Sequence, residues 1–253
     1  MVSIFRLKGR ALQIDNTAVM TLTFMTGLAV MVTAGLLPVT FDRLVLSFVA
    51  SYGEKAYLWA RFSAALLFIV ISFGVYSALR LGAKRYLFKK AVRKKPVTRD
   101  IFFYFGPKHF FSALLYSFRL LLVKLSVMSF CLLPSGVCLG VVDSLSRQGV
   151  SALVCLSMGV TAALLFINGM LFYSLFCSSF FLCDYYFIDG KYLSFRHLIS
   201  SSQKNMQGKN ALLARLRLSF SGWLLLCIPI FPVPYVWGYY NQSLAVAAAE
   251  FME

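Results

Sequence analysis

Five long stretches of this chain contain no charged residue: residues 16–41, 62–79, 125–142, 148–183 and 218–249. A helix needs about 20 apolar residues to cross a hydrocarbon core about 30 Å thick, and each stretch is near or above that length. Lipid offers no hydrogen-bond partners to a backbone, so such spans are expected to be helical. The sequence therefore predicts an all-α, polytopic membrane protein with about five transmembrane helices.

The composition also indicates that lipid is the main solvent. Hydrophobic residues make up 60% of the chain and charged residues 13%, against about 45–50% and about 25% in ordinary soluble domains. The six cysteines form no C-x-x-C pair and all lie in the uncharged stretches, which is typical of small hydrophobic residues rather than metal ligands or disulfides. We therefore predict one integral membrane domain over residues 1–253.

The net charge of +16 lies mainly on one side of the predicted membrane. With five spans and the N-terminus inside, 21 of the 25 Lys and Arg residues lie in cytoplasmic segments and four lie outside. The positive-inside rule then predicts a multi-pass protein of the cell membrane with a cytoplasmic N-terminus and with Glu253 outside.

The most basic segment is a predicted cytoplasmic loop over residues 80–108, which forms a partly amphipathic helix if the preceding span continues into it. Seven of its cations fall within 12 residues, with no acid among them: Lys84, Arg85, Lys89, Lys90, Arg93, Lys94 and Lys95. Such clusters gain about 1 kcal/mol per cation near an anionic leaflet. We predict that they bind anionic headgroups; a plain topology signal and a protein partner are the alternatives. Nucleic acid is not expected, because no basic stretch lies on a soluble domain.

Two amphipathic cytoplasmic helices are predicted from hydrophobic periodicity. Residues 109–124 carry an apolar arc opposite a polar one, and we expect this helix to run on into the next span, which reaches Pro134. Residues 194–207 form the second, with Ser194 as its N-cap and Gly208 as its stop.

Two of the uncharged stretches do not fit one straight span. Residues 148–183 would extend about 54 Å as a single helix, so that helix either tilts and protrudes or breaks at Asn168-Gly169. Residues 218–249 contain three prolines between 229 and 234, which forbid a regular helix there. This last run is either one broken span or two pieces, so six spans are the alternative to five.

No catalytic, cofactor-binding or metal site is predicted. His109 and His197 have no Glu or Cys at metal-ligand spacing, and the acids all lie outside the uncharged stretches, so no intramembrane proton relay is expected. The sequence favours a non-enzymatic structural or accessory membrane subunit that binds lipid, a protein partner or a second copy of itself. The alternative is a small-solute transporter or permease subunit, with a site near Asn168 and the broken last run.

A motif near the C-terminus resembles a known family. It consists of S-x-x-x-M-x-G, then L-S-F-x-G-W, then a distal P-Y, and its residues are Ser202, Met206, Gly208, Ser219, Phe220, Gly222, Trp223, Pro234 and Tyr235. The pattern resembles a family of uncharacterised bacterial integral membrane proteins, the domain of unknown function numbered nine hundred and seventy-five. The resemblance covers roughly residues 100–250 and implies a membrane protein without implying an activity.

The motif also has a physical interpretation. Gly208 ends a helix, and Ser219 can bond back to its own helix backbone. Gly222 is expected to permit close helix approach, and Trp223 to anchor the helix in the membrane interface. These roles require no ligand.

Overall fold

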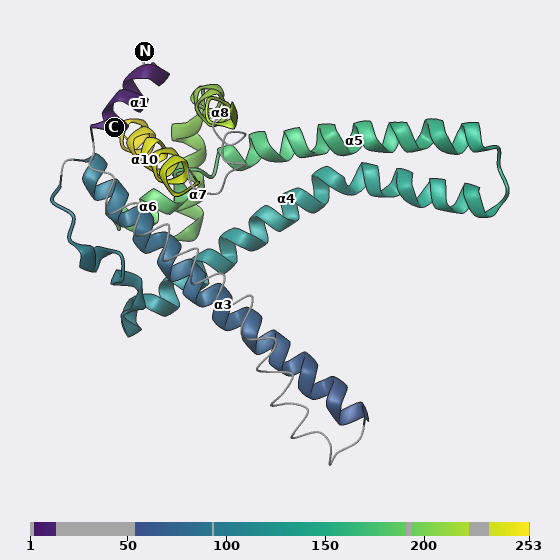
Figure 1. The fold of residues 1–253 in the computed structure, drawn as a ribbon, viewed down its shortest axis with the longest axis horizontal. Coiled ribbons are helices and arrows are strands. Elements are labelled where there is room, and N and C mark those ends of the chain that lie inside the picture. Colours follow the sequence, from purple (N-terminus) through teal and green to yellow (C-terminus); the bar gives the residue numbers. More distant parts are fainter. Residues whose placement is uncertain (1–2, 14–53, 93, 191–193, 223–232, 253) are drawn as a thin grey trace. The chain divides into compact units, whose positions relative to one another are not determined.

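The computed structural model describes residues 3–13, 54–92, 94–190, 194–222 and 233–252, and every regular element among them is a helix (Figure 1). The chain forms two compact units. The first comprises Met1–Leu115 with Arg215–Glu253, and the second comprises Tyr116–Ala214. The predicted span over residues 16–41 lies outside the described residues.

Helix α3, Glu54–Ala91, is longer than the predicted span that it contains. Its 38 residues extend about 57 Å at 1.5 Å per residue. The basic segment predicted over residues 80–108 continues this helix through residues 80–91, as expected if the preceding span runs on into it, because Leu81, Leu87 and Phe88 keep an apolar face that is buried. Two short 3-10 turns follow, η1 Thr98–Asp100 and η2 Phe103–Phe105.

The core of the first unit is α10, Val233–Met252. It packs against α3 and against the N-terminal helix α1, Ile4–Leu12. Nearly every residue from 236 to 251 is buried or half-buried, and the fully enclosed ones are mostly small: Ser243, Ala245, Ala247 and Ala248. A helix that is enclosed on all sides is a core helix rather than a surface helix.

Contacts of α1 bring the two ends of the chain together. Arg10 Nη1 lies 2.6 Å from Glu250 Oε1, near the end of α10. Lys8 Nζ donates to the carbonyl oxygen of Ser219 at 3.4 Å. Ser219 directly follows α8, Asn210–Leu218, so α1 touches both ends of the uncharged stretch 218–249.

In the second unit, α4 and α5 form an antiparallel hairpin (Figure 1). Helix α4 is Pro107–Arg147 and contains Pro134, while α5 is Ala152–Ser178. The prediction that residues 109–124 are helical and run on into the next span is confirmed. The predicted span was expected to reach Pro134, but the helix does not stop there and continues to Arg147.

Small residues recur along the less exposed face of α5: Cys155, Gly159, Ala162, Gly169 and Cys177 are all buried or half-buried. Of these, Gly169 has α4 atoms directly against it in the described residues. A Cβ added at Gly169 would lie 2.5 Å from the carbonyl oxygen of Cys131 on α4. The helix therefore does not break at Asn168-Gly169, because this glycine is the point of close helix approach. The five cysteines of the described residues are all free.

Three helices complete the second unit and its boundary: α6 Cys183–Asp189, α7 Phe195–Met206, and α8. The predicted helix over 194–207 is confirmed, with Leu198, Ser202 and Met206 buried. Ser194 stands at the N-cap position, but its side chain makes no capping hydrogen bond. Gly208 has φ +74° and ends the helix, as predicted.

Candidate functional site

The basic end of α3 is partly neutralised within the fold. Asp100 Oδ1 lies 2.6 Å from Lys89 Nζ and 3.5 Å from Arg85 Nε. Two of the seven predicted lipid-binding cations therefore form ion pairs inside the first unit. The sequence has no acid among the seven cations, but the 3-10 turn η1 brings Asp100 back beside two of them.

Gly82 allows the chain after η1 to pass close to α3. A Cβ at Gly82 would collide with the carbonyl group of Ile101, so the chain after η1 crosses α3 directly over the glycine. Asp100 also accepts a hydrogen bond from the Val97 N–H at 3.1 Å. The Arg85 guanidinium sits 3.6 Å from the centre of the Phe103 ring, a cation–π distance. The turn is thus held by backbone fit, charge and stacking together.

Competing effects set the charge state of Asp100. Burial by itself would raise the pKa of its carboxyl. The hydrogen bonds from Lys89 and from the Val97 N–H, with the charges of Lys89 and Arg85, outweigh burial and hold the pKa below its ordinary value of 3.8. The carboxylate is therefore ionised at neutral pH and keeps its two cations paired.

The other predicted cations are distributed differently. Lys84 and Lys90 are half-buried, and Lys90 Nζ lies 5.9 Å from the ring centre of Tyr86. Lys94 and Lys95 are exposed. Arg93 lies outside the described residues.

A neighbouring surface was not identified from the sequence. Residues 94–108, which we term the basic–aromatic turn, expose large apolar side chains between their cations: Val97 is 61%, Phe102 48% and Phe105 39% exposed. The exposed cations of the same segment are Lys94, Lys95, Arg99 and Lys108. The signal in the sequence was the run Phe102-Phe103-Tyr104-Phe105 directly after the basic stretch.

Such a surface suits a membrane interface. Apolar side chains enter the acyl boundary while Lys and Arg reach the headgroups. His109 stacks on Phe103 with ring centres 4.3 Å apart. Within the ranges that the structure describes, no group of three His, Cys, Asp or Glu side chains is placed to hold a metal ion.

The first part of the resemblance motif fastens α7 within the second unit. Ser202 Oγ donates to the carbonyl oxygen of Ser179 at 2.6 Å, just beyond α5. Met206 is fully buried, and Gly208 closes the helix. Nearby, the Tyr116 hydroxyl donates to the buried Asp184 at 2.8 Å. These residues have packing roles.

The second part of the motif lies in the first unit. Ser219 Oγ donates to the carbonyl oxygen of Leu216 at 2.6 Å, so the predicted bond to its own helix is confirmed. Phe220 is buried against the rings of Tyr239 and Tyr240, at 5.1 and 5.3 Å between ring centres. The two parts of the motif therefore belong to different units, and each is described by its own contacts.

The described residues show no close helix approach at Gly222. A Cβ added there meets none of their atoms within 4 Å, and the residue is exposed. Gly136 and Gly140 are equally open toward the described part of the chain. Trp223 lies outside the described residues. Pro234 and Tyr235 begin α10, but their side chains are among those the structure leaves undescribed.

Asn168 lies on an exposed face of α5, next to the Gly169 contact with α4. The amide therefore does not lie between these two helices. The permease alternative stays a prediction, because residues 223–232 of the broken last run, which would form the rest of its site, lie outside the described residues.

Comparison of the chain with models of known protein families, with curated proteins and with solved structures finds no match. The resemblance therefore rests on its motif residues, and a function has to be argued from the surfaces of the molecule itself.

Proposed function

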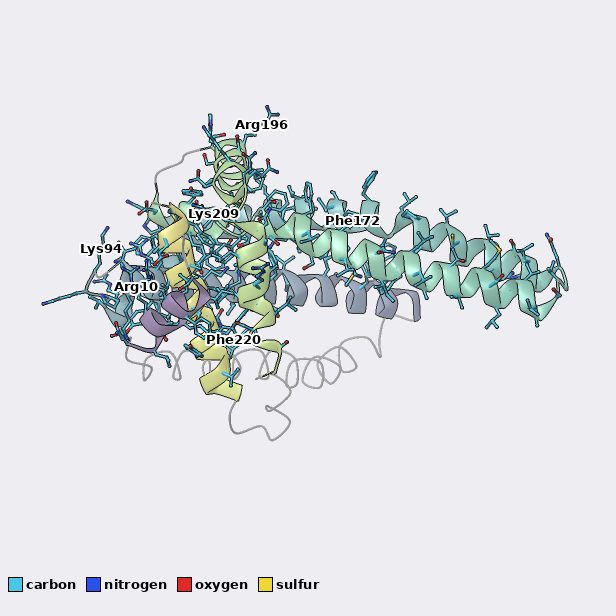
Figure 2. The ribbon with its side chains drawn as sticks, turned by 90° about the horizontal axis from the view of Figure 1, so that it is seen from above. Arg10, Lys94, Phe172, Arg196, Lys209 and Phe220 are labelled. Carbon is cyan, nitrogen blue, oxygen red and sulfur yellow. The ribbon has the colours of Figure 1, made fainter. Side chains whose placement is uncertain are left out.

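We propose that this chain is a non-enzymatic, multi-pass integral membrane protein, a structural or accessory subunit whose basic cytoplasmic surface binds anionic lipid headgroups. The observation that carries the proposal is the exposure of bulky apolar side chains along the α4–α5 hairpin. Phe130 is 80%, Leu153 77% and Phe172 68% exposed, and Figure 2 shows Phe172 projecting from α5. Soluble monomers rarely expose continuous apolar surface beyond a few hundred Å².

The dimensions of the hairpin support this interpretation. The described residues include two helical segments long and apolar enough to cross a membrane, Pro107–Arg147 and Ala152–Asp189. The uncharged part of α4, residues 125–142, extends about 27 Å, close to a hydrocarbon core of about 30 Å. At its tip, Asp143 and Arg147 form an exposed ion pair at 2.9 Å. Arg119 and Lys124 lie toward the other end, which the positive-inside rule assigns to the cytoplasm.

The contacts of α1 favour six crossings over five. With five crossings, the N-terminal segment and Glu250 would lie on opposite faces of the membrane. The 2.6 Å ion pair between Arg10 and Glu250 requires one face. We therefore favour the alternative in which the stretch 218–249 enters the membrane and returns, which leaves both termini in the cytoplasm.

The basic–aromatic turn is the part of the cytoplasmic surface best suited to headgroups. It follows the predicted span within α3, and its cations are exposed beside apolar side chains. Arg85 and Lys89 contribute less than the sequence pattern suggests, because Asp100 pairs with both. Lys94, Lys95 and Arg99 are the main candidates for headgroup contact.

Spin-labelled lipids in reconstituted full-length protein provide the test. The immobilised fraction of labelled phosphatidylglycerol, relative to labelled phosphatidylcholine, measures selectivity for anionic lipid. Changing Lys94, Lys95 and Arg99 to Gln should lower this selectivity several-fold, since each cation contributes about 1 kcal/mol at low salt.

The matched control changes Arg196, Lys204 and Lys209 to Gln, which removes the same charge from α7 and the residues after it. We expect a smaller loss from this triple. If both triple variants lose the same selectivity, the effect comes from net charge and not from the basic–aromatic turn. If the variant at Lys94, Lys95 and Arg99 keeps its selectivity, headgroup binding by the turn is rejected.

A further inference from the structure

The N-terminal helix α1 has two faces of different character. It starts at Ser3, whose Oγ accepts the Arg6 N–H at 3.3 Å in an N-cap arrangement. Leu7 and Ala11 are completely buried, on the side that packs against α10. Nine isolated residues would form a helix only marginally, so this packing is what stabilises α1.

Lys8 belongs to the inner side of the helix. Besides its bond to the Ser219 carbonyl, its ammonium lies 4.5 Å from the centre of the Phe220 ring. Burial lowers the pKa of this lysine. The Tyr239 hydroxyl donates to the Lys8 carbonyl oxygen at 3.4 Å. Lys8 therefore joins α1 to both arms of the last uncharged stretch.

The outer side of the helix is apolar with basic flanks. Phe5 is 89% and Leu12 55% exposed, and a spacing of seven residues places them on one face, two turns apart. Arg6 is exposed and the Arg10 side chain is 51% exposed. Residues 3–13 contain three cations and no acid.

An exposed Phe alone is ordinary for a protein surface, so the position of α1 decides the interpretation. Ser219 is the second residue of the uncharged stretch 218–249, and Glu250 is the first residue beyond it. If the stretch enters the membrane and returns, as proposed above, a helix that contacts both of its ends lies at the boundary of the hydrocarbon core. At this depth an apolar face meets acyl chains and its basic flank meets headgroups.

We propose that α1 is an interfacial membrane anchor that inserts Phe5 and Leu12 into the cytoplasmic leaflet and sets Arg6 beside anionic headgroups. The proposal rests on the membrane function proposed above. By holding Ser219 and Glu250 at one level, α1 also fixes the two ends of the returning stretch against the same leaflet.

Quenching by brominated lipid tests the anchor in the full-length protein. Phe5→Trp places a reporter on the apolar face, Gln13→Trp places one on the polar flank, and the unmodified protein supplies the background of the native tryptophans. In vesicles of brominated phosphatidylglycerol, the added emission of Phe5→Trp should be shifted to the blue and quenched several-fold more than that of Gln13→Trp. A Phe5→Trp signal that is unquenched and emits as in water would overturn the anchor.

Two further variants distinguish a failure of the anchor proposal from a failure of the proposed membrane function. Phe130→Trp on α4 should be quenched if the hairpin crosses the membrane. Quenching at position 130 without quenching at position 5 would reject the anchor alone, while quenching at neither would reject the membrane function. Adding Arg6→Gln to Phe5→Trp should reduce the preference for brominated phosphatidylglycerol over brominated phosphatidylcholine, and an unchanged preference would rule out the anionic headgroup contact.

Discussion

Helices α5 and α10 come from uncharged stretches of the same kind, yet one is largely exposed and the other almost fully buried. Along α5 the exposed residues are bulky, for example Leu164, Phe172 and Leu175. Along α10, residues 242–248 are all at most 9% exposed. Each helix lies in its own compact unit, so the contrast reflects the local packing of each.

Residue size explains the contrast. In lipid there is no hydrophobic gain from bringing helices together, so close packing through small residues drives association. Alanine and serine are spread around α10 and let both α1 and α3 pack closely. On α5 the buried residues are the small ones Ala162, Gly169 and Ser178, while its bulky side chains are mostly exposed. Both helices come from uncharged stretches, so it is the distribution of small residues that separates the enclosed helix from the exposed one.

The same substitution in both helices tests this contrast most strongly. Ala247 in α10 is completely buried, and Ala163 in α5 is exposed. Ala247→Leu should lower the free energy of unfolding by about 3 kcal/mol, the upper end of the range for overpacking. Ala163→Leu should change it by less than about 0.5 kcal/mol. Thermal unfolding in detergent measures both, and equal effects would mean that α10 is not a core helix.

A pair of glycines sharpens the description of the hairpin. Gly169→Ala forces a Cβ against the Cys131 carbonyl and should destabilise the protein by about 2 kcal/mol, although alanine is the better helix former. Gly140→Ala meets open space and should be neutral or stabilise by up to about 1 kcal/mol. Detergent melting curves give the sign of each change. Stabilisation by Gly169→Ala would contradict the close approach of α4 and α5.

The stability of the Asp100 ion pairs in the first unit should depend on pH more than that of the exposed pair in the hairpin, although the effect is smaller than those of the substitutions above. The folded-state pKa of Asp100 lies below 3.8, so its stabilising contribution is complete above that value and disappears as the pH falls through the lower folded-state pKa. Asp100→Asn should cost less than about 1 kcal/mol at pH 7, with the difference from the parent vanishing in strong acid. Asp143→Asn breaks only an exposed pair in the hairpin and serves as the control. Melting temperatures across the acid range provide the measurement, and a difference that persists in acid would show that the ion pairs do not stabilise the turn.

Local regularities made part of this fold predictable. Helical periodicity located residues 109–124 and 194–207, and the positive φ at Gly208 follows from its place after the last periodic residue. Ser219 bonds to its own helix as expected, because such a bond requires only the residues of one turn. The membrane setting was predicted from the length of the uncharged stretches, and the described residues contain two helical segments long and apolar enough to cross a membrane.

Other features depend on contacts between distant residues. Pro134 was expected to end a helix, but neighbouring turns carry the helix through it. The glycines at 136, 140 and 222 have no described atom near them, whereas Gly82 and Gly169 lie against backbone carbonyl groups. Nothing in the local sequence distinguishes the first kind of glycine from the second. Asp100 follows the basic stretch closely, yet its pairing with Lys89 requires the chain to turn over Gly82.

The sequence by itself determined the helical class and the uncharged stretches, and it predicts a basic cytoplasmic side, because each follows from composition and from the spacing of charges along the chain. The tertiary structure decided which uncharged helix is enclosed, which cations Asp100 neutralises, and that α1 brings Arg10 to Glu250. Those outcomes depend on which surfaces meet after folding, and a one-dimensional pattern of apolar and basic residues is compatible with many such pairings.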